Sequence, residues 1–149
     1  MVTRISNSPA ETEALGESWG RAAERGLVIG LCGDLGAGKT QLVKGIARGL
    51  GFSGRVHSPT FTLINVYAGA RLTLFHIDLY RLDAPEQIVA AGLEEYLTPA
   101  GVTVVEWADR WFGKRPGAHP LAGSAPFRWA ELEMVSNTQR RITYEDFGA

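Results

Sequence analysis

Hydrophobic residues in this chain form short continuous runs that alternate with stretches of helical periodicity. The runs 27–32 and 102–105 are predominantly apolar, which is typical of buried strands. Segment 60–67 alternates weakly between apolar and polar positions and predicts a further strand. A short turn separates it from another predicted strand over 71–77, so these two strands are expected to be antiparallel neighbours.

Three segments carry helical signals. Apolar residues recur at intervals of three and four after Lys39, and Gly51 suits the end of that helix. Segment 8–11 begins with a capping serine, continues with proline and ends with glutamate, and the apolar positions that follow it fall on one face. The sequence Asp83–Glu86 repeats this chemistry and predicts a helix that extends to about Leu97.

The end of the chain has a different pattern. Residues 113–126 are rich in Gly, Pro and Ala and predict a flexible loop. Segments 127–135 and 140–146 predict a β-hairpin around the polar turn 136–138. The order of elements favours a single α/β domain over 1–149, with a mixed sheet flanked by helices and a C-terminal hairpin.

Composition narrows the class of protein. The 149 residues are 45% hydrophobic and carry a net charge of −1, which disfavours a self-sufficient nucleic-acid binder, since such proteins usually have a basic surface. The one cysteine cannot form an intrachain disulfide, so the reducing cytoplasm is the expected location, and Cys32 is expected to be a small buried residue. No apolar signal-peptide core is present at the N-terminus, and no stretch is long enough to span a bilayer, so no membrane association is expected.

The sequence Gly33–Thr40, GDLGAGKT, matches the phosphate-binding pattern G-x-x-x-x-G-K-[ST] in full. Its glycines let the backbone curl around an anion, Lys39 can reach the β- and γ-phosphates, and the Thr40 hydroxyl is a ligand that Mg²⁺ accepts. A predicted strand precedes the pattern and a predicted helix follows it, which is the setting that a P-loop NTPase-like fold requires. The alternative is a glycine-rich turn between two core elements.

Two acidic residues follow predicted strands. Glu106 ends the apolar run 102–105, as in the second signature of P-loop proteins, and it is the candidate that holds Mg²⁺. The alternative is a solvated glutamate at a strand end. Asp78 follows the strand that ends at Ile77 and is a candidate to orient the attacking water or to support the metal. A purely structural role in capping the following turn is its alternative.

Other residues leave their roles open. Ser58 or Thr60 could supply a hydroxyl that senses the γ-phosphate, or the two could simply belong to a Ser-Pro turn. Trp107 is expected either to pack near the nucleotide base and gate its pocket or to be a core residue. Arg140 and Arg141 could reach phosphate, but exposed strand arginines are usually solvated. The histidines lack metal-ligand spacing, so no metal role is assigned to His57, His76 and His119.

Four sequences, GDLGAGKT, SPTFTL, HIDLYRL and VEW, occur in this order and spacing, and together they resemble the TsaE (YjeE) family. The resemblance runs from about Ser8 to Trp107. It implies a small bacterial P-loop ATPase that is slow alone and supports TsaB and TsaD, whose machinery makes N6-threonylcarbamoyladenosine at position 37 of tRNA. Contact with tRNA would then occur only through that complex.

The resemblance also implies a set of site residues. Lys39, Asp78 and Glu106 would be catalytic, and Thr40 and Glu106 would hold Mg²⁺. The residues expected to bind ATP are Gly33, Asp34, Leu35, Gly36, Ala37, Gly38, Lys39, Thr40, Gln41 and Trp107.

Two other functions are compatible with a P-loop. A small-molecule kinase would need an acceptor pocket and an arginine-bearing lid, for which the arginines at 110, 115 and 128 are candidates. A nucleotide-gated assembly module would bind ATP without needing to hydrolyse it. A GTPase is disfavoured, because the sequence has no Asn-Lys-x-Asp segment to recognise guanine.

Overall fold

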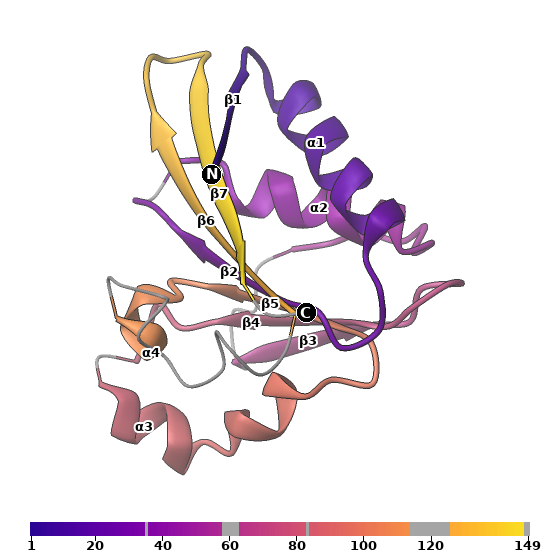
Figure 1. Cartoon of the computed structure of the whole chain (residues 1–149), viewed down its shortest axis with the longest axis vertical. Coiled ribbons are helices and arrows are strands. Elements are labelled where there is room, and N and C mark those ends of the chain that lie inside the picture. The colour runs from indigo at the N-terminus through magenta and orange to yellow at the C-terminus, as the bar shows by residue number, and fades with distance from the viewer. Residues whose placement is uncertain (35, 58–62, 83, 114–125, 148–149) are drawn as a thin grey trace.

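One mixed β-sheet organises the structure, a computed structural model that describes residues 1–34, 36–57, 63–82, 84–113 and 126–147. Within these residues seven strands lie in the order β1-β7-β6-β2-β5-β4-β3, and helices cover both faces of the sheet (Figure 1). The strands are β1 (Val2–Ser6), β2 (Val28–Cys32), β3 (Ile64–Tyr67), β4 (Leu74–Asp78), β5 (Val102–Glu106), β6 (Phe127–Met134) and β7 (Arg140–Phe147). The helices are α1 (Pro9–Ala22), α2 (Lys39–Gly49), α3 (Pro85–Ala90), α4 (Asp109–Phe112) and the 3₁₀ helix η1 (Leu93–Leu97).

The centre of the sheet is parallel and its edges are antiparallel. β2 pairs in parallel with β5 and β6, and β4 pairs in parallel with β5. The β3–β4, β6–β7 and β1–β7 pairs are antiparallel. Every residue of β2 and β5 is buried, as expected for strands covered on both faces. The predicted α/β fold with a mixed sheet is confirmed, together with the antiparallel β3–β4 pair and the C-terminal hairpin.

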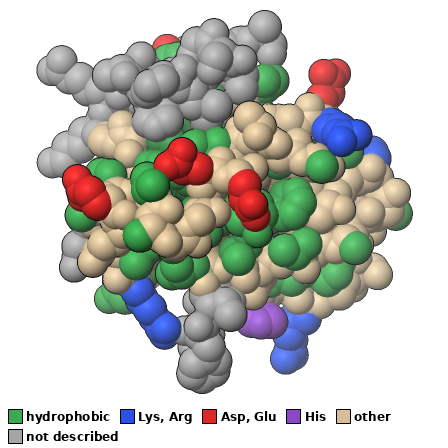
Figure 2. Space-filling model, turned by 90° about the horizontal axis from the view of Figure 1, so that it is seen from below, with side chains coloured by type: hydrophobic (Ala, Val, Ile, Leu, Met, Phe, Trp, Pro, Cys, Tyr) green, Lys and Arg blue, Asp and Glu red, His purple; other side chains and the backbone are tan. Residues whose placement is uncertain are grey.

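Two hydrophobic layers enclose the sheet. α1 and α2 pack Trp19, Leu42 and Ile46 against one face. α3, η1 and α4 cover the other face, where Cys32 and Phe112 are part of the core. Burial raises the pKa of the Cys32 thiol far above its usual range, in agreement with the predicted small buried residue. Figure 2, a view from the side of α3, shows separate acidic side chains among apolar ones and no continuous basic surface on the described part of this face.

Glycines bring α1 and α2 into backbone contact. A Cβ atom added at Gly45 of α2 would lie 2.0 Å from the carbonyl oxygen of Glu13, and one added at Gly16 of α1 would lie 2.2 Å from that of Leu42. No side chain fits at these distances, so glycine is required for the two helices to approach this closely. The close contact holds α1 against α2, the helix that follows the glycine-rich loop.

The structure corrects two predictions of local structure. The single helix predicted over 83–97 is wrong, because α3 ends at Ala90 and Gly92, with φ +76°, separates it from η1. β1 was not predicted at all. Its first four residues are exposed, so no alternation marks it, and only its pairing with β7 makes it a strand.

Other predictions differ from the structure only in their bounds, or fall outside the described residues. β4 begins at Leu74 rather than at residue 71, and the start of the strand predicted over 60–67 falls partly outside the described residues. Asp83 and most of the loop predicted over 113–126 also lie outside them. No helix in the described ranges combines the length and the apolar character needed to cross a membrane.

We predict that Gly45→Ala destabilises the protein. The added methyl group would meet the backbone of α1, and overpacking of this kind typically costs about 1–3 kcal/mol, which outweighs the gain of about 1 kcal/mol in helix propensity. Urea unfolding measures the change. Arg48→Ala on the same helix is the control and should change the free energy of unfolding by less than about 1 kcal/mol, because it removes only exposed ion pairs. Equal stabilities for Gly45→Ala and the wild type would contradict the close helix contact.

Candidate functional site

The loop between β2 and α2 has a backbone that requires its glycines. Gly33, Gly36 and Gly38 have φ values of +143°, +82° and +101°, in the region that side chains other than glycine rarely adopt. α2 begins directly after Gly38, which offers no side-chain cap to the first turn. The first turn of a helix without a side-chain cap is a position where backbone N–H groups can bind an anion. Leu35 lies outside the described residues.

A cleft of about 540 Å³ opens beside this loop. Gly36, Gly38, Lys39, Thr40 and Gln41 are the part of the predicted phosphate site that lines the cleft. The ends of β4 and β5, the N-terminus of α1 and the β6–β7 hairpin contribute further lining residues. Its volume is in the range usual for cofactor sites.

The remaining predicted loop residues shape the turn. The carbonyl of Asp34 accepts hydrogen bonds from the Ala37 N–H at 3.1 Å and from Lys39 Nζ at 2.9 Å. Gly33 lies so close to β6 that an added Cβ would be 2.5 Å from the Leu132 carbonyl oxygen. These contacts give the loop its conformation before any ligand binds.

Lys39 is held in the cleft by several partners. Its ammonium group donates to the carbonyls of Gly33 and Asp34 and lies 4.2 Å from the centre of the Trp107 ring. Burial lowers the pKa of Lys39, and the negative charges of Glu106 and Asp78 act in the opposite direction. The cation is thus anchored beside two carboxyl groups, in a position that suits contact with an anionic ligand.

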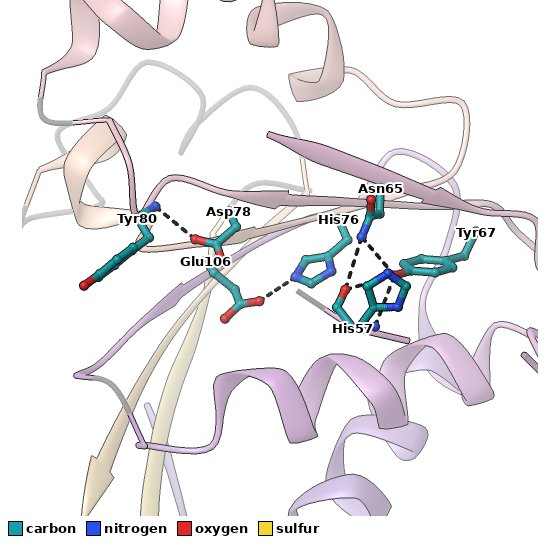
Figure 3. Close-up of polar contacts among 7 residues, drawn as sticks. All are labelled: His57, Asn65, Tyr67, His76, Asp78, Tyr80 and Glu106. Atoms are coloured by element: carbon teal, nitrogen blue, oxygen red, sulfur yellow. Dashed lines mark hydrogen bonds and ion pairs between the residues drawn. The ribbon is translucent and has the colours of Figure 1, made fainter. Parts of the chain in front are cut away.

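The two predicted acidic residues are neighbours in the sheet. Asp78 and Glu106 are register partners in the parallel β4–β5 pair, and both line the cleft. The solvated glutamate considered for Glu106 is wrong, because its side chain is only 3% exposed and its Oε2 lies 2.5 Å from His76 Nε2 (Figure 3). Asp78 also performs the structural role considered for it, since its Oδ1 accepts the Tyr80 N–H at 2.9 Å. Burial raises the pKa of Asp78, which the charge of Glu106 reinforces.

Trp107 has an unusual backbone. Its φ of +60° is a left-handed value that bulky residues seldom adopt, and such strain is concentrated at functional sites. The ring is half-buried, 5.3 Å from the Tyr80 ring and 5.0 Å from the Arg110 guanidinium. It therefore lies at the mouth of the cleft over Lys39 and is not a fully enclosed core residue.

Arg140, for which the sequence left open contact with phosphate or simple solvation, lines the cleft. Its Nε donates to the Gly36 carbonyl at 3.0 Å, and its Nη1 donates to the carbonyls of Ser136 at 2.8 Å and Gln139 at 3.0 Å. Arg141 instead forms an exposed ion pair with Glu133 at 2.8 Å. Alternation along the strand indicates that the two arginines face opposite sides, but not which of them faces the loop.

His57 marks the start of the segment that carries Ser58 and Thr60, which lie outside the described residues. The His57 carbonyl accepts hydrogen bonds from Tyr67 Oη and from Asn65 Nδ2, both at 3.1 Å (Figure 3). These hydrogen bonds anchor His57, where the segment begins, to β3.

Within the described part of the chain no group of three His, Cys, Asp or Glu residues is placed to bind a metal by itself. His119 falls outside that part.

Comparison with known proteins agrees with the resemblance seen in the sequence. The family model "Threonylcarbamoyl adenosine biosynthesis protein TsaE" matches residues 6–142. The chain is 46% identical over 112 residues to a Treponema pallidum protein named for tRNA threonylcarbamoyladenosine biosynthesis, with 75% of this chain and 82% of that protein aligned. The protein of the same name from Synechocystis is 44% identical over 66% of this chain and 65% of its own length.

The fold has a solved counterpart. The crystal structure of Bacillus subtilis YdiB superposes with a TM-score of 0.75 and 32% identity, covering 98% of this chain and 84% of that one. The family match and the shared fold extend well beyond the phosphate-binding loop. This chain belongs to the TsaE family, which is named for threonylcarbamoyladenosine biosynthesis.

Proposed function

We propose that this protein binds and hydrolyses ATP with Mg²⁺, as the ATPase subunit of a machinery that makes threonylcarbamoyladenosine in tRNA. The observation that carries the proposal is a single cleft that contains Lys39, Thr40 and the in-register carboxyl groups of Asp78 and Glu106. Hydrolysis at a P-loop requires an anion cradle, a metal position and a group that orients water, and these residues can fill all three roles.

The phosphates would occupy the loop and the first turn of α2. Gly33–Thr40 and Gln41 supply backbone N–H groups at the positive end of the helix. The Lys39 ammonium, now bonded to loop carbonyls, would exchange these partners for phosphate oxygens. Most of its position is already set, so little side-chain freedom would be lost on binding.

The oxygen groups near Lys39 suit Mg²⁺. Thr40 offers a hydroxyl and Glu106 a carboxylate, and Mg²⁺ prefers such ligands together with phosphates and water. When bound, the ion would neutralise charge on the phosphates during transfer. Asp78, whose carboxyl group is in register with Glu106, would orient the attacking water.

The direction of the nucleotide follows from the shape of the cleft. The N-cap Ser8, Pro9 and Thr12 at the start of α1 line the cleft together with the hairpin residues Asn137 and Thr138. The nucleoside would lie beside them. Trp107 lies over Lys39 instead, so its position favours a gate over the terminal phosphate rather than a platform for the base.

Homologues of TsaB and TsaD are the proposed partners, in the cytoplasm. The net charge of −1 and the absence of a continuous basic surface on the described part of the face in Figure 2 favour action on a protein complex, with tRNA reached only through it. The partners would regulate an intrinsically slow hydrolysis.

The kinase lid considered for the arginines at 110, 115 and 128 finds no support in Arg110 and Arg128. Arg110 donates to the carbonyls of Leu79, Tyr80 and Leu82, which stabilises the turn after β4. Arg128 forms a two-point ion pair with Asp146, at 2.6 and 2.8 Å. Both are engaged in structural contacts, and the residue at 115 lies outside the described ranges.

We predict that Lys39→Met weakens ATP binding by roughly 10- to 100-fold, the value of one strong charge-assisted contact. Calorimetric titration with ATP and Mg²⁺ measures it. Lys44→Met on the same helix lies outside the cleft and should bind normally. Wild-type affinity in Lys39→Met would refute the phosphate site.

We predict that Glu106→Gln lowers the rate of ATP hydrolysis by roughly 10²- to 10³-fold, because a lost transition-state contact of this kind has that effect. The substitution preserves size and hydrogen bonding, so nucleotide binding without Mg²⁺ should persist. Steady-state phosphate release measures the rate. Glu133→Gln, on an exposed ion pair, is the control. An unchanged Mg²⁺ dependence in Glu106→Gln would remove Glu106 from the site.

We predict that Asp78→Asn stabilises the protein at neutral pH while it impairs hydrolysis. Since folding raises the pKa of Asp78, its ionisation opposes folding: the group favours the folded state at low pH, and that benefit is lost as pH rises through the raised pKa. Thermal unfolding of wild type and variant between pH 4 and 8 should show a gap that widens towards neutral pH.

Asp146→Asn is the matched control, for which the expected change in stability at neutral pH has the opposite sign. The Arg128 guanidinium lowers the pKa of Asp146, so its carboxylate stabilises the fold above its unfolded pKa and that stability is lost as pH falls through the folded pKa. Asp146→Asn should therefore melt lower than wild type at neutral pH. A loss of stability in Asp78→Asn at neutral pH would show that burial is not the dominant influence on Asp78.

A further inference from the structure

His76 lies beneath the proposed metal site and carries no assigned role. It occupies the middle of β4 and is fully buried, and its Nε2 lies 2.5 Å from Oε2 of Glu106 (Figure 3). Register explains the contact. His76 pairs with Val104 and Asp78 pairs with Glu106, so these side chains project from the same face of the β4–β5 pair and His76 reaches Glu106 diagonally.

The surroundings of His76 are apolar. Leu74 and Val104, which share its face of the sheet, are fully buried in the hydrophobic layer. The Nδ1 atom of His76 has no hydrogen-bond partner among the residues that the structure describes. A polar ring is costly in such a layer unless its hydrogen bonds are useful, and the contact that compensates it here is the one to Glu106.

The contact with His76 gives the two carboxylate oxygens of Glu106 different surroundings. A carboxylate that binds a metal ion only accepts hydrogen bonds, so in that role Glu106 would accept a hydrogen bond from a proton carried on Nε2 of His76. The other carboxylate oxygen points away from the imidazole (Figure 3), and the residue lines the cleft. The charges of Lys39 and Glu106 attract each other, and the contact with His76 holds Oε2 of Glu106 on the side of the imidazole.

We infer that His76 is a positioning residue for the proposed Mg²⁺ site: its hydrogen bond to Oε2 aims the second oxygen of Glu106 at the ion in the cleft. This inference rests on the proposed function. Groups that orient a metal ligand typically change metal affinity by about 10- to 100-fold when they are removed. His76 would thus act on Mg²⁺ affinity without touching the nucleotide.

A matched pair of polar variants tests the inference. His76→Gln places an amide N–H near the position of Nε2, whereas His76→Asn carries the same group one carbon shorter and cannot reach Glu106. Mg²⁺ is titrated calorimetrically into protein saturated with ADP, so no turnover is needed. We expect His76→Asn to bind Mg²⁺ at least 10-fold more weakly than wild type and His76→Gln to recover most of the affinity. Binding of ADP in the presence of EDTA should change by less than about twofold in both variants.

Two further variants make the outcome decisive. If His76→Asn does not fold, His76→Leu, which suits the apolar layer and lacks a donor, carries the same expectation. In a Glu106→Gln background, replacement of His76 should no longer affect Mg²⁺ affinity, because the oriented carboxylate is gone. Wild-type Mg²⁺ affinity in His76→Asn or His76→Leu, or equal losses in the Gln and Asn variants, would overturn the positioning role. Wild-type protein that binds no adenine nucleotide with Mg²⁺ would instead overturn the proposed function, and the inference with it.

Discussion

Parallel pairing of β2, β5 and β4 is the constraint on which the rest of the site depends. Strands that run in the same direction end at the same edge, so the chain leaves β2 into the glycine loop beside the ends of the other two strands. Leu31 pairs with Glu106, and Glu106 pairs with Asp78. The glycine loop and both carboxyl groups therefore lie side by side at one edge of the sheet. The buried, predominantly apolar strands that make this pairing stable also define the geometry of the cleft.

The same arrangement concentrates charge where burial is unfavourable. Burial raises the pKa of Asp78 and lowers that of Lys39, so each group resists its charged form even though the two charges attract each other. The left-handed backbone of Trp107 adds strain at the same place. A fold selected only for stability would avoid a buried Asp78, a buried Lys39 and a left-handed backbone at Trp107. Their presence in one cleft agrees with the proposed binding of a charged ligand, which would compensate these costs.

The two ends of the described chain complete the cleft. β1 pairs with β7 so that Ser6 is opposite Arg140, and this brings the start of α1 beside the hairpin turn. The glycine contacts between α1 and α2 then hold α1 against the helix that follows the glycine loop. Arg140 links the hairpin to the loop through the Gly36 carbonyl. A displacement of the loop would therefore disturb its contact with Arg140 of the hairpin and the packing of α1 on α2.

Local signals in the sequence were sufficient for the strand, glycine loop and helix around residues 28–49, because each depends on neighbours a few positions away. They also placed Asp78 and Glu106 at strand ends, and the combination of motifs indicated the family. The contacts of His76 with Glu106 and of Arg140 with the glycine loop could not be predicted, since alternation along a strand separates two faces but does not tell which face meets α2 or the loop. Only the pairing of β4 with β5, and of β7 with β1 and β6, decided that. Contacts between residues far apart in the chain, such as His76 with Glu106, form only when the whole sheet assembles, and no local pattern encodes them.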